Sequence, residues 1–295
     1  MEALLAFELH ELGVGFLLLI FLAAIWAGAI NAVVGSGTLV TFPVLVAMGV
    51  PPVSATISNA MGLIAGNFTG AWGYRREIVQ VKPVLAKLVP ASFLGGIVGA
   101  TLLITLPEEI FGRVAPALIV LSLAMVVMQP KLSTWVKGRA ADQAADPDTP
   151  SPGDPPEAAA AKAAGSVRWP LILLVFFAGI YGGYFVAAQG ILLMGVLGVF
   201  LAATIQQANG VKNLLVAFVN LVAGLNYIIV DYLLREPNDR MILWGVVAII
   251  AVGSTVGGFL GAWVGRRLSP VVLRSVILIL GLVALTVLLR NLFVG

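Results

Sequence analysis

Ten apolar segments follow one another along the chain, five on each side of a polar, proline-rich stretch. The first five lie at about 14–34, 38–50, 53–73, 83–106 and 114–128. The second five lie at about 169–188, 191–204, 208–234, 241–264 and 271–292. About 20 apolar residues are needed for an α-helix to cross the hydrocarbon core of a bilayer. The pattern therefore predicts an all-α polytopic membrane protein.

The second and seventh apolar segments are too short for an ordinary span, at about 13 residues each. Each follows a small polar break, Asn31–Pro43 in the first half and Tyr184–Gly190 in the second. Irregular backbone is tolerated at membrane depth only where it is packed in protein or lines a wet cavity. We expect two interrupted or re-entrant helices that meet at these breaks, which leaves open whether the chain crosses eight or ten times.

The two halves repeat weakly. Gly37 and Gly190 are 153 positions apart (190 − 37), Tyr74 and Tyr227 are also 153 apart (227 − 74), and Asn59 and Asn213 are 154 apart (213 − 59). Five segments is an odd number, so the second half enters the membrane in the opposite direction. Two inverted repeats with interrupted helices form a known transporter architecture, with the binding site near the midplane.

The domain division that follows is 1–130 for the N-terminal membrane repeat, 131–168 for a linker and 169–295 for the C-terminal membrane repeat. The linker contains Asp146–Pro156, in which proline and aspartate dominate and no apolar residue occurs. Such a segment cannot bury a core. We expect a disordered cytoplasmic tether.

Basic residues cluster in three places, which are Arg75–Lys87, Lys131–Arg168 and Arg266–Arg274. All three fall on one side if the chain crosses the membrane in order. The positive-inside rule then makes the linker cytoplasmic and places both termini outside the cell (inner, plasma) membrane.

Composition narrows the function. The chain of 295 residues is 60% hydrophobic and 11% charged, its mean hydropathy is +1.05, and it has no Cys and one His, His10 near the N-terminus. Without Cys there is no disulfide, no thiolate metal site and no cysteine nucleophile. The net charge of +3 reflects loops that set membrane orientation, so we expect no nucleic-acid partner. We also expect no cofactor, no metal and no enzymatic activity; a homodimer is compatible with base rates.

Nearly all charged residues lie in loops, at segment ends or in the linker, and the exception is Lys212, just after the short seventh segment. A charge at membrane depth costs roughly 2.5–3.5 kcal/mol on insertion scales and indicates function by default. The alternative is a lysine that extends to the cytoplasmic interface. Asn209 and Asn213 share one helical face beside it, and Ser58 and Asn59 occupy the corresponding place in the first half. Their amides and hydroxyls can donate to a small anion, or they can join helices to each other.

The breaks add backbone donors. A helix that begins near Gly37 and Thr38, and another near Gly190 and Ile191, would each present an N-terminus to the centre, which is a favourable place for an anion. The alternative is that the glycines only permit close helix packing. Asp231, near the outer end of the eighth segment, is the single acidic residue in the pattern. A neutral-to-positive site of this kind indicates an anionic substrate.

Several motifs resemble those of the TauE/SafE sulfite exporter family, also called the TSUP permeases. They are Gly35–Pro43, Gly49–Pro52, Ser58-Asn59 and Gly73–Glu77 in the first half, and Gly179–Phe185, Gly190-Ile191, Ala208–Asn213 and Asn220 in the second. The resemblance covers both halves and excludes the linker. It implies export of sulfite, organosulfonates or a related anion, with Asn59, Asn209, Lys212 and Asn213 at the polar motif positions.

The chain departs from the family pattern at both breaks. Ser36 replaces a common Gly, and Val186, Ala188 and Gln189 stand where Gly or an aliphatic residue is expected. Residues and resemblance together predict a secondary transporter that exports a small sulfur oxyanion by alternating access. The alternative is a channel or an uptake carrier for another small anion.

Overall fold

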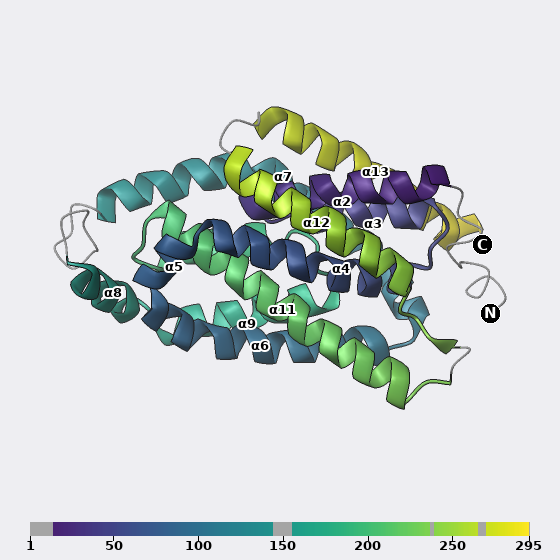
Figure 1. The fold of residues 1–295 in the computed structure, drawn as a ribbon, viewed down its shortest axis with the longest axis horizontal. Coiled ribbons are helices and arrows are strands. Elements are labelled where there is room, and N and C mark those ends of the chain that lie inside the picture. Colours follow the sequence, from purple (N-terminus) through teal and green to yellow (C-terminus); the bar gives the residue numbers. More distant parts are fainter. Residues whose placement is uncertain (1–13, 144–154, 237–238, 265–269, 295) are drawn as a thin grey trace.

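The computed structural model describes residues 14–143, 155–236, 239–264 and 270–294, and the fold is all-α, as the sequence predicts (Figure 1). The first half contains α2 (Val14–Val33), α3 (Thr38–Ala47), α4 (Pro52–Gly73), α5 (Arg75–Gln80), α6 (Lys82–Thr105) and α7 (Glu108–Gln143). The second contains α8 (Pro156–Gly165), α9 (Trp169–Tyr184), α10 (Gln189–Phe200), α11 (Ile205–Leu233), α12 (Trp244–Val264) and α13 (Pro270–Val294).

Each of the ten predicted apolar segments forms a helix. Among the described residues, five helices are long and apolar enough to cross a membrane, lying at 14–33, 82–105, 108–132, 205–233 and 244–261. The two half-length helices are confirmed, because α3 has 10 residues and α10 has 12. At 1.5 Å per residue they rise about 15 and 18 Å, roughly half of the hydrocarbon core.

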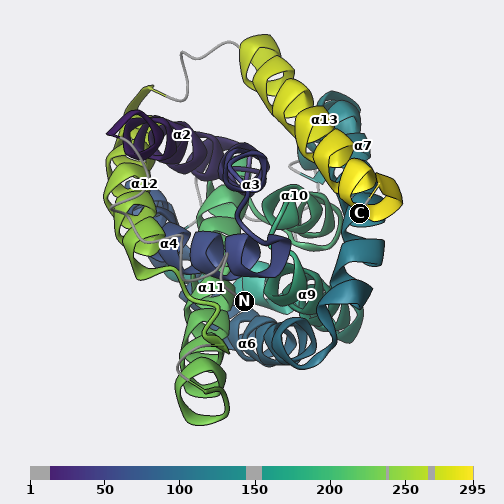
Figure 2. The same cartoon turned by 90° about the vertical axis from the view of Figure 1, so that its right-hand side faces the viewer.

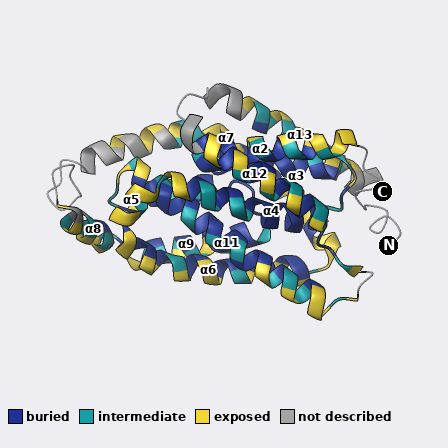
Figure 3. Cartoon of the chain, viewed as in Figure 1, coloured by how far each residue is buried: buried dark blue, intermediate teal, exposed yellow. Residues whose placement is uncertain are grey.

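The outer surface is apolar. Large hydrophobic side chains are exposed on several helices, such as Phe177 of α9, Leu225 and Ile229 of α11, and Phe259 of α12. Exposed positions run along the length of the helices (Figure 3). Water would penalise this surface heavily, whereas lipid does not. The chain is therefore a multi-pass membrane protein.

Helices of the two halves pack against one another around a central pair, α4 and α11 (Figure 2). α2 packs on α12 and α6 packs on α9, while α4 also contacts α12 and α11 also contacts α6. α3 packs on α13, and α10 packs on α7. In chain order, α2, α3, α4, α6 and α7 correspond to α9, α10, α11, α12 and α13. With this correspondence the contact of α2 with α12 becomes that of α9 with α6, and the other pairs are related in the same way. The opposite membrane orientation of the halves stays a prediction.

Small residues allow the closest of these contacts. A Cβ added at Gly28 of α2 would meet the backbone of Ser254 in α12, and one added at Gly95 of α6 would meet the backbone of Phe176 in α9. Such close approach is how helices associate in lipid, where no hydrophobic effect drives them together.

The predicted linker differs from expectation where the structure describes it. α7 continues past the apolar run to Gln143, with Pro116 and Pro130 inside it, and α8 occupies Pro156–Gly165. α8 forms because its alanines favour helix, a proline stands at its first position and Lys162 lies in its last turn. The ends of the segment are thus helical rather than disordered; residues 144–154 lie outside the described residues.

α5, α8 and the first turns of α6 and α11 gather at one end of the molecule, called here the α5–α8 end (Figure 1). The Lys87 Nζ donates to the Ala164 carbonyl oxygen at 2.8 Å, and the Gln207 Nε2 donates to the Gln80 Oε1 at 3.0 Å. The basic residues of α5 and early α6 belong to this end. Arg266 and Arg267 of the third basic cluster lie outside the described residues.

Candidate functional site

The two breaks touch at the centre of the molecule, as the sequence predicts. The N–H of Gly190 donates to the carbonyl oxygen of Gly35 at 3.1 Å. A Cβ at Gly35 would lie 2.5 Å from the Gly190 Cα, and Gly35 has a φ of +85° that only glycine adopts readily. The backbones therefore meet here because neither residue has a side chain.

Backbone donors at the breaks are already engaged. The Gly37 N–H donates to the Asn31 Oδ1 at 3.2 Å, and the Gly190 N–H is held by Gly35. The predicted role of these two glycines as ligand donors is therefore not supported by this conformation, in which both serve packing. Thr38, at the start of α3, is buried.

Lys212 lies in the third turn of α11 and is 0% exposed, and its Nζ has no hydrogen-bond partner. The position is fixed by a strong helix start: Thr204 and Gln207 form a reciprocal capping box, with bonds of 3.2 and 2.9 Å. Lys212 therefore does not reach solvent, which disagrees with an interfacial lysine.

Some of the predicted polar side chains make hydrogen bonds that join helices, and others keep a free polar atom in the interior. The Asn213 Nδ2 donates to the Ala32 carbonyl oxygen at 3.1 Å and ties α11 to α2. Asn59 is fully buried; its Oδ1 accepts from the Thr41 hydroxyl, and its Nδ2 has no partner. The Ser58 Oγ accepts from the Leu243 N–H at 3.0 Å, so this hydroxyl serves the segment that leads into α12.

Gln189 is the polar side chain of the second break. It is fully buried, and neither its Oε1 nor its Nε2 has a partner. Its amide lies directly against Gly182 of α9, because a Cβ added there would overlap Cδ, Oε1 and Nε2. The missing side chain at Gly182 makes the space that the amide fills.

Among the described residues, nine side chains have a buried polar atom without a hydrogen-bond partner, and six of them fall into three pairs; the other three are Ser92, Arg235 and Arg240. The pairs are Ser36 with Gln189, Asn59 with Lys212, and Asn67 with Asn220. Members of each pair are 153 positions apart (189 − 36, 212 − 59, 220 − 67), the spacing of Gly37 and Gly190. Sequence reasoning left Asn67 and Asn220 out of the site, although this spacing was the signal that could have found them.

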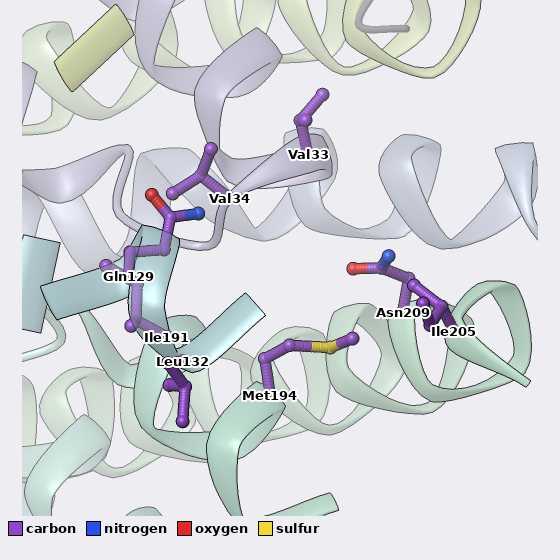
Figure 4. A pocket seen from close by; sticks show the side chains of 8 residues that line it. All are labelled: Val33, Val34, Gln129, Leu132, Ile191, Met194, Ile205 and Asn209. Atoms are coloured by element: carbon purple, nitrogen blue, oxygen red, sulfur yellow. The ribbon is translucent and has the colours of Figure 1, made fainter. Parts of the chain in front are cut away.

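A small cavity of about 100 Å³ opens beside the first break (Figure 4). Its walls come from the end of α2, from α7, from α10 and from the first turn of α11. The lining residues are Val33, Val34, Gln129, Leu132, Ile191, Met194, Ile205 and Asn209. Gln129 and Asn209 supply the polar side chains. Asn209 precedes Lys212 by three residues, so the two share a helical face.

Acidic residues contribute no ligand cluster in the described part of the chain. No group of three or more His, Asp or Glu that could hold a metal ion occurs among the described residues. Asp231 is buried, and its two oxygens accept from the Met241 N–H at 2.8 Å and the Ile242 N–H at 3.3 Å. That carboxylate therefore holds the connection before α12.

The profile of the family described as Sulfite exporter TauE/SafE matches residues 20–288. This match covers both halves and all of the helices that build the site. The chain belongs to the TauE/SafE family. The family is described as one of sulfite exporters.

Individual relatives match over shorter stretches. A "Probable membrane transporter protein" of Haemophilus influenzae is 28% identical over 123 residues, which is 41% of this chain and 48% of the relative. The "Probable membrane transporter protein YfcA" of Escherichia coli K12 is 26% identical over 114 residues, 38% of this chain and 42% of the relative. The chain thus spans about half the length of the relatives it matches. No solved structure matches.

One departure from the TauE/SafE pattern has a clear backbone consequence. Val186 has a φ of 65° and Ala188 a φ of 58°. Only glycine enters this region without steric cost, and a β-branched residue there is a genuine outlier. A glycine-rich second break, as the family resemblance implies, fits this conformation without strain.

Proposed function

We propose that this TauE/SafE protein is a secondary transporter that exports a small sulfur oxyanion, sulfite or an organosulfonate, by alternating access. The observation that carries the proposal is the buried Nζ of Lys212, which has no partner. A charged amine at membrane depth is stabilised by an opposite charge. In a transporter, the substrate is the group that supplies it.

The neighbouring groups favour an anion over a cation. The Asn59 oxygen is used by Thr41, which leaves the Nδ2 as a donor. The carboxylate of Asp231 is occupied by two backbone N–H groups. Lys212, Asn209, Asn59 and Gln189 are therefore the side chains that we assign to the substrate, and their amides and amine match the several acceptor oxygens of a sulfur oxyanion.

The position of the cavity supports a carrier that faces the cytoplasm in this state. The cavity includes Gln129 and Leu132, which flank Lys131 in α7, and Ile205 at the start of α11. By the positive-inside rule the α5–α8 end is cytoplasmic in the inner membrane, with both termini outside. The contact of Gly35 with Gly190 closes the centre, which favours a carrier over an open channel.

Export needs no proton if the anion moves with the membrane potential. One negative charge that leaves an inside-negative cell gains about 2.3 kcal/mol per 100 mV. This corresponds to a gradient of roughly 50-fold, because 1.4 kcal/mol is a factor of ten.

Flux into proteoliposomes tests the proposal. Radiolabelled sulfite, methanesulfonate, sulfate and acetate are compared, with the potential set by potassium and valinomycin. We expect saturable flux of sulfite or the sulfonate that follows the potential. Flux of acetate or sulfate alone supports the alternative, an uptake carrier for another small anion, and unsaturable flux supports a channel.

A further inference from the structure

A chain of three groups fixes how one buried amide is turned. The Gly37 N–H can only donate, and it donates to the Asn31 Oδ1 at 3.2 Å. The Nδ2 of Asn31 is therefore the group that faces α4, and it donates to the Asn67 Oδ1. The Nδ2 of Asn67 must then point the other way. It has no partner, although Asn67 is only 5% exposed.

We propose that Asn67 is a further anion-binding residue on the transport path, and that Asn31 is a positioning residue that keeps the Asn67 amine group turned toward the anion. This inference rests on the proposed function, since it assumes that an anion passes between α4 and α11.

Two contacts between α4 and α11 give the depth of Asn67. A Cβ at Gly70 would lie 3.8 Å from the Asn213 Nδ2, and a Cβ at Gly224 would lie 3.2 Å from the Ile64 Cδ1. Rising numbers in one helix meet falling numbers in the other, so the helices are antiparallel. Asn67 is three residues from Gly70, about 4.5 Å further from the α5–α8 end. Asn67 therefore lies further from the α5–α8 end than Lys212 does.

Asn220 stands along the same stretch of α11, because its position lies between Asn213 and Gly224. It is fully buried, and both of its amide atoms lack a partner. Unlike Asn67, it has no neighbour that fixes which atom faces the path. Two unpartnered amides on facing helices at this depth are costly unless they serve a ligand.

The orientation of the Asn67 amide determines whether it favours a negatively or a positively charged ligand. An asparagine that is free to turn offers either an oxygen or an amine group. Here the backbone of the first break, acting through Asn31, leaves only the donor. An anion is favoured and a cation is not. A role in joining α2 to α4 would explain the Asn31–Asn67 bond but not the unpaired Nδ2.

The test measures the KM for sulfite flux and the melting temperature of purified full-length protein. Asn67→Leu removes the donor. Asn31→Asp still accepts from Gly37 but cannot donate, so the Asn67 amide turns its oxygen to the path. We expect each variant to raise KM about tenfold or more, as for loss of a hydrogen bond to a charged group. Asn226→Asp is the control, since that amide bonds to Thr101 and Ile97 on α6. Its KM should not change.

The double variant Asn31→Asp/Asn67→Leu shows whether Asn31→Asp acts through the Asn67 amide or through the charge of its own carboxylate. If Asn31 acts only through Asn67, Asn31→Asp raises KM no further in the Asn67→Leu background. A further rise would mean that the new carboxylate repels the anion by itself, which overturns the positioning role. A lower melting temperature with unchanged KM in Asn67→Leu would make the bond purely structural. If the wild-type protein carries acetate and not sulfite, the proposal that it exports a sulfur oxyanion fails, and the same variants then test Asn67 with acetate. If it carries neither anion, both proposals fail.

Discussion

The N–H of Gly190 donates to the carbonyl oxygen of Gly35 across 3.1 Å, so the break of each half closes on the break of the other. The two residues are far apart in sequence and come from α10 and from the segment before α3. This contact holds the half-helices at the centre, beside the cavity and the buried polar side chains.

Adding a methyl group at this contact should damage the fold. In Gly190→Ala the Cβ would lie 2.7 Å from the Gly35 oxygen, and in Gly35→Ala the residue would also have to keep a φ of +85°. We expect each to lose about 2 kcal/mol or more of stability, seen as a lower melting temperature in detergent. Gly112→Ala is the control: nothing lies within 4 Å there, so the change should be neutral or stabilising. Equal melting temperatures for all three variants would contradict the close contact.

Substituting glycine in the second break should relieve backbone strain there. Val186→Gly and Ala188→Gly remove side chains that are strained at φ values of 65° and 58°. Left-handed backbone costs roughly 1–2 kcal/mol for a residue with a Cβ, so Ala188→Gly should raise the melting temperature. Val186→Gly gains less because it also loses buried contacts. Ala187→Gly, between them, has no strain to lose and should destabilise; stabilisation there and not at Ala188 would argue against these backbone angles.

A substitution at Gln189 should offset the loss of stability caused by a substitution at Gly182. Gly182→Ala places a methyl group on the Gln189 amide, which must shift. We expect lower stability and weaker anion binding from this single change. Gln189→Ala empties the space, so the double variant should regain stability relative to Gly182→Ala. Additive losses in the double-mutant cycle would show that the two positions do not interact.

We expect Asp231 to contribute to stability and not to transport. Asp231→Ala leaves the Met241 and Ile242 N–H groups unpaired, at a cost of about 1–3 kcal/mol, whereas Asp231→Asn keeps one acceptor and loses less. The melting temperature should fall in that order, while the KM for the anion stays the same. A changed KM at an unchanged melting temperature would instead make Asp231 part of the transport machinery.

The fold was largely predictable from the sequence, because the length of each apolar run determines whether it can cross a bilayer. The short runs before Gly49 and before Leu201 gave the half-helices, and the polar breaks gave their meeting point. The extension of α7 to Gln143 was missed, since hydropathy ends at the membrane whereas helix propensity does not. α8 was missed for the same reason.

The site was only partly predictable. The apolar surroundings of Lys212 left two interpretations open, a buried functional lysine and one that extends to the interface, and only the structure decides for burial. The bonds that engage Ser58, Asn213 and Gly37 depend on which helices face one another. Those facing pairs are long-range and leave no trace in a local pattern. The spacing of 153 positions between Asn67 and Asn220 was visible in the sequence, but the bond from Asn31 that turns the Asn67 amide was not.

Ligand binding to purified protein tests the central claim most directly. Sulfite, methanesulfonate, sulfate and acetate are added to wild type, Lys212→Ala and Lys87→Ala, and the melting temperature is recorded. A ligand that binds only the folded state raises it. The account predicts a rise with sulfite or the sulfonate that Lys212→Ala loses and Lys87→Ala, an exposed lysine at the α5–α8 end, retains. An unchanged rise in Lys212→Ala would contradict the assignment of the buried lysine to the anion.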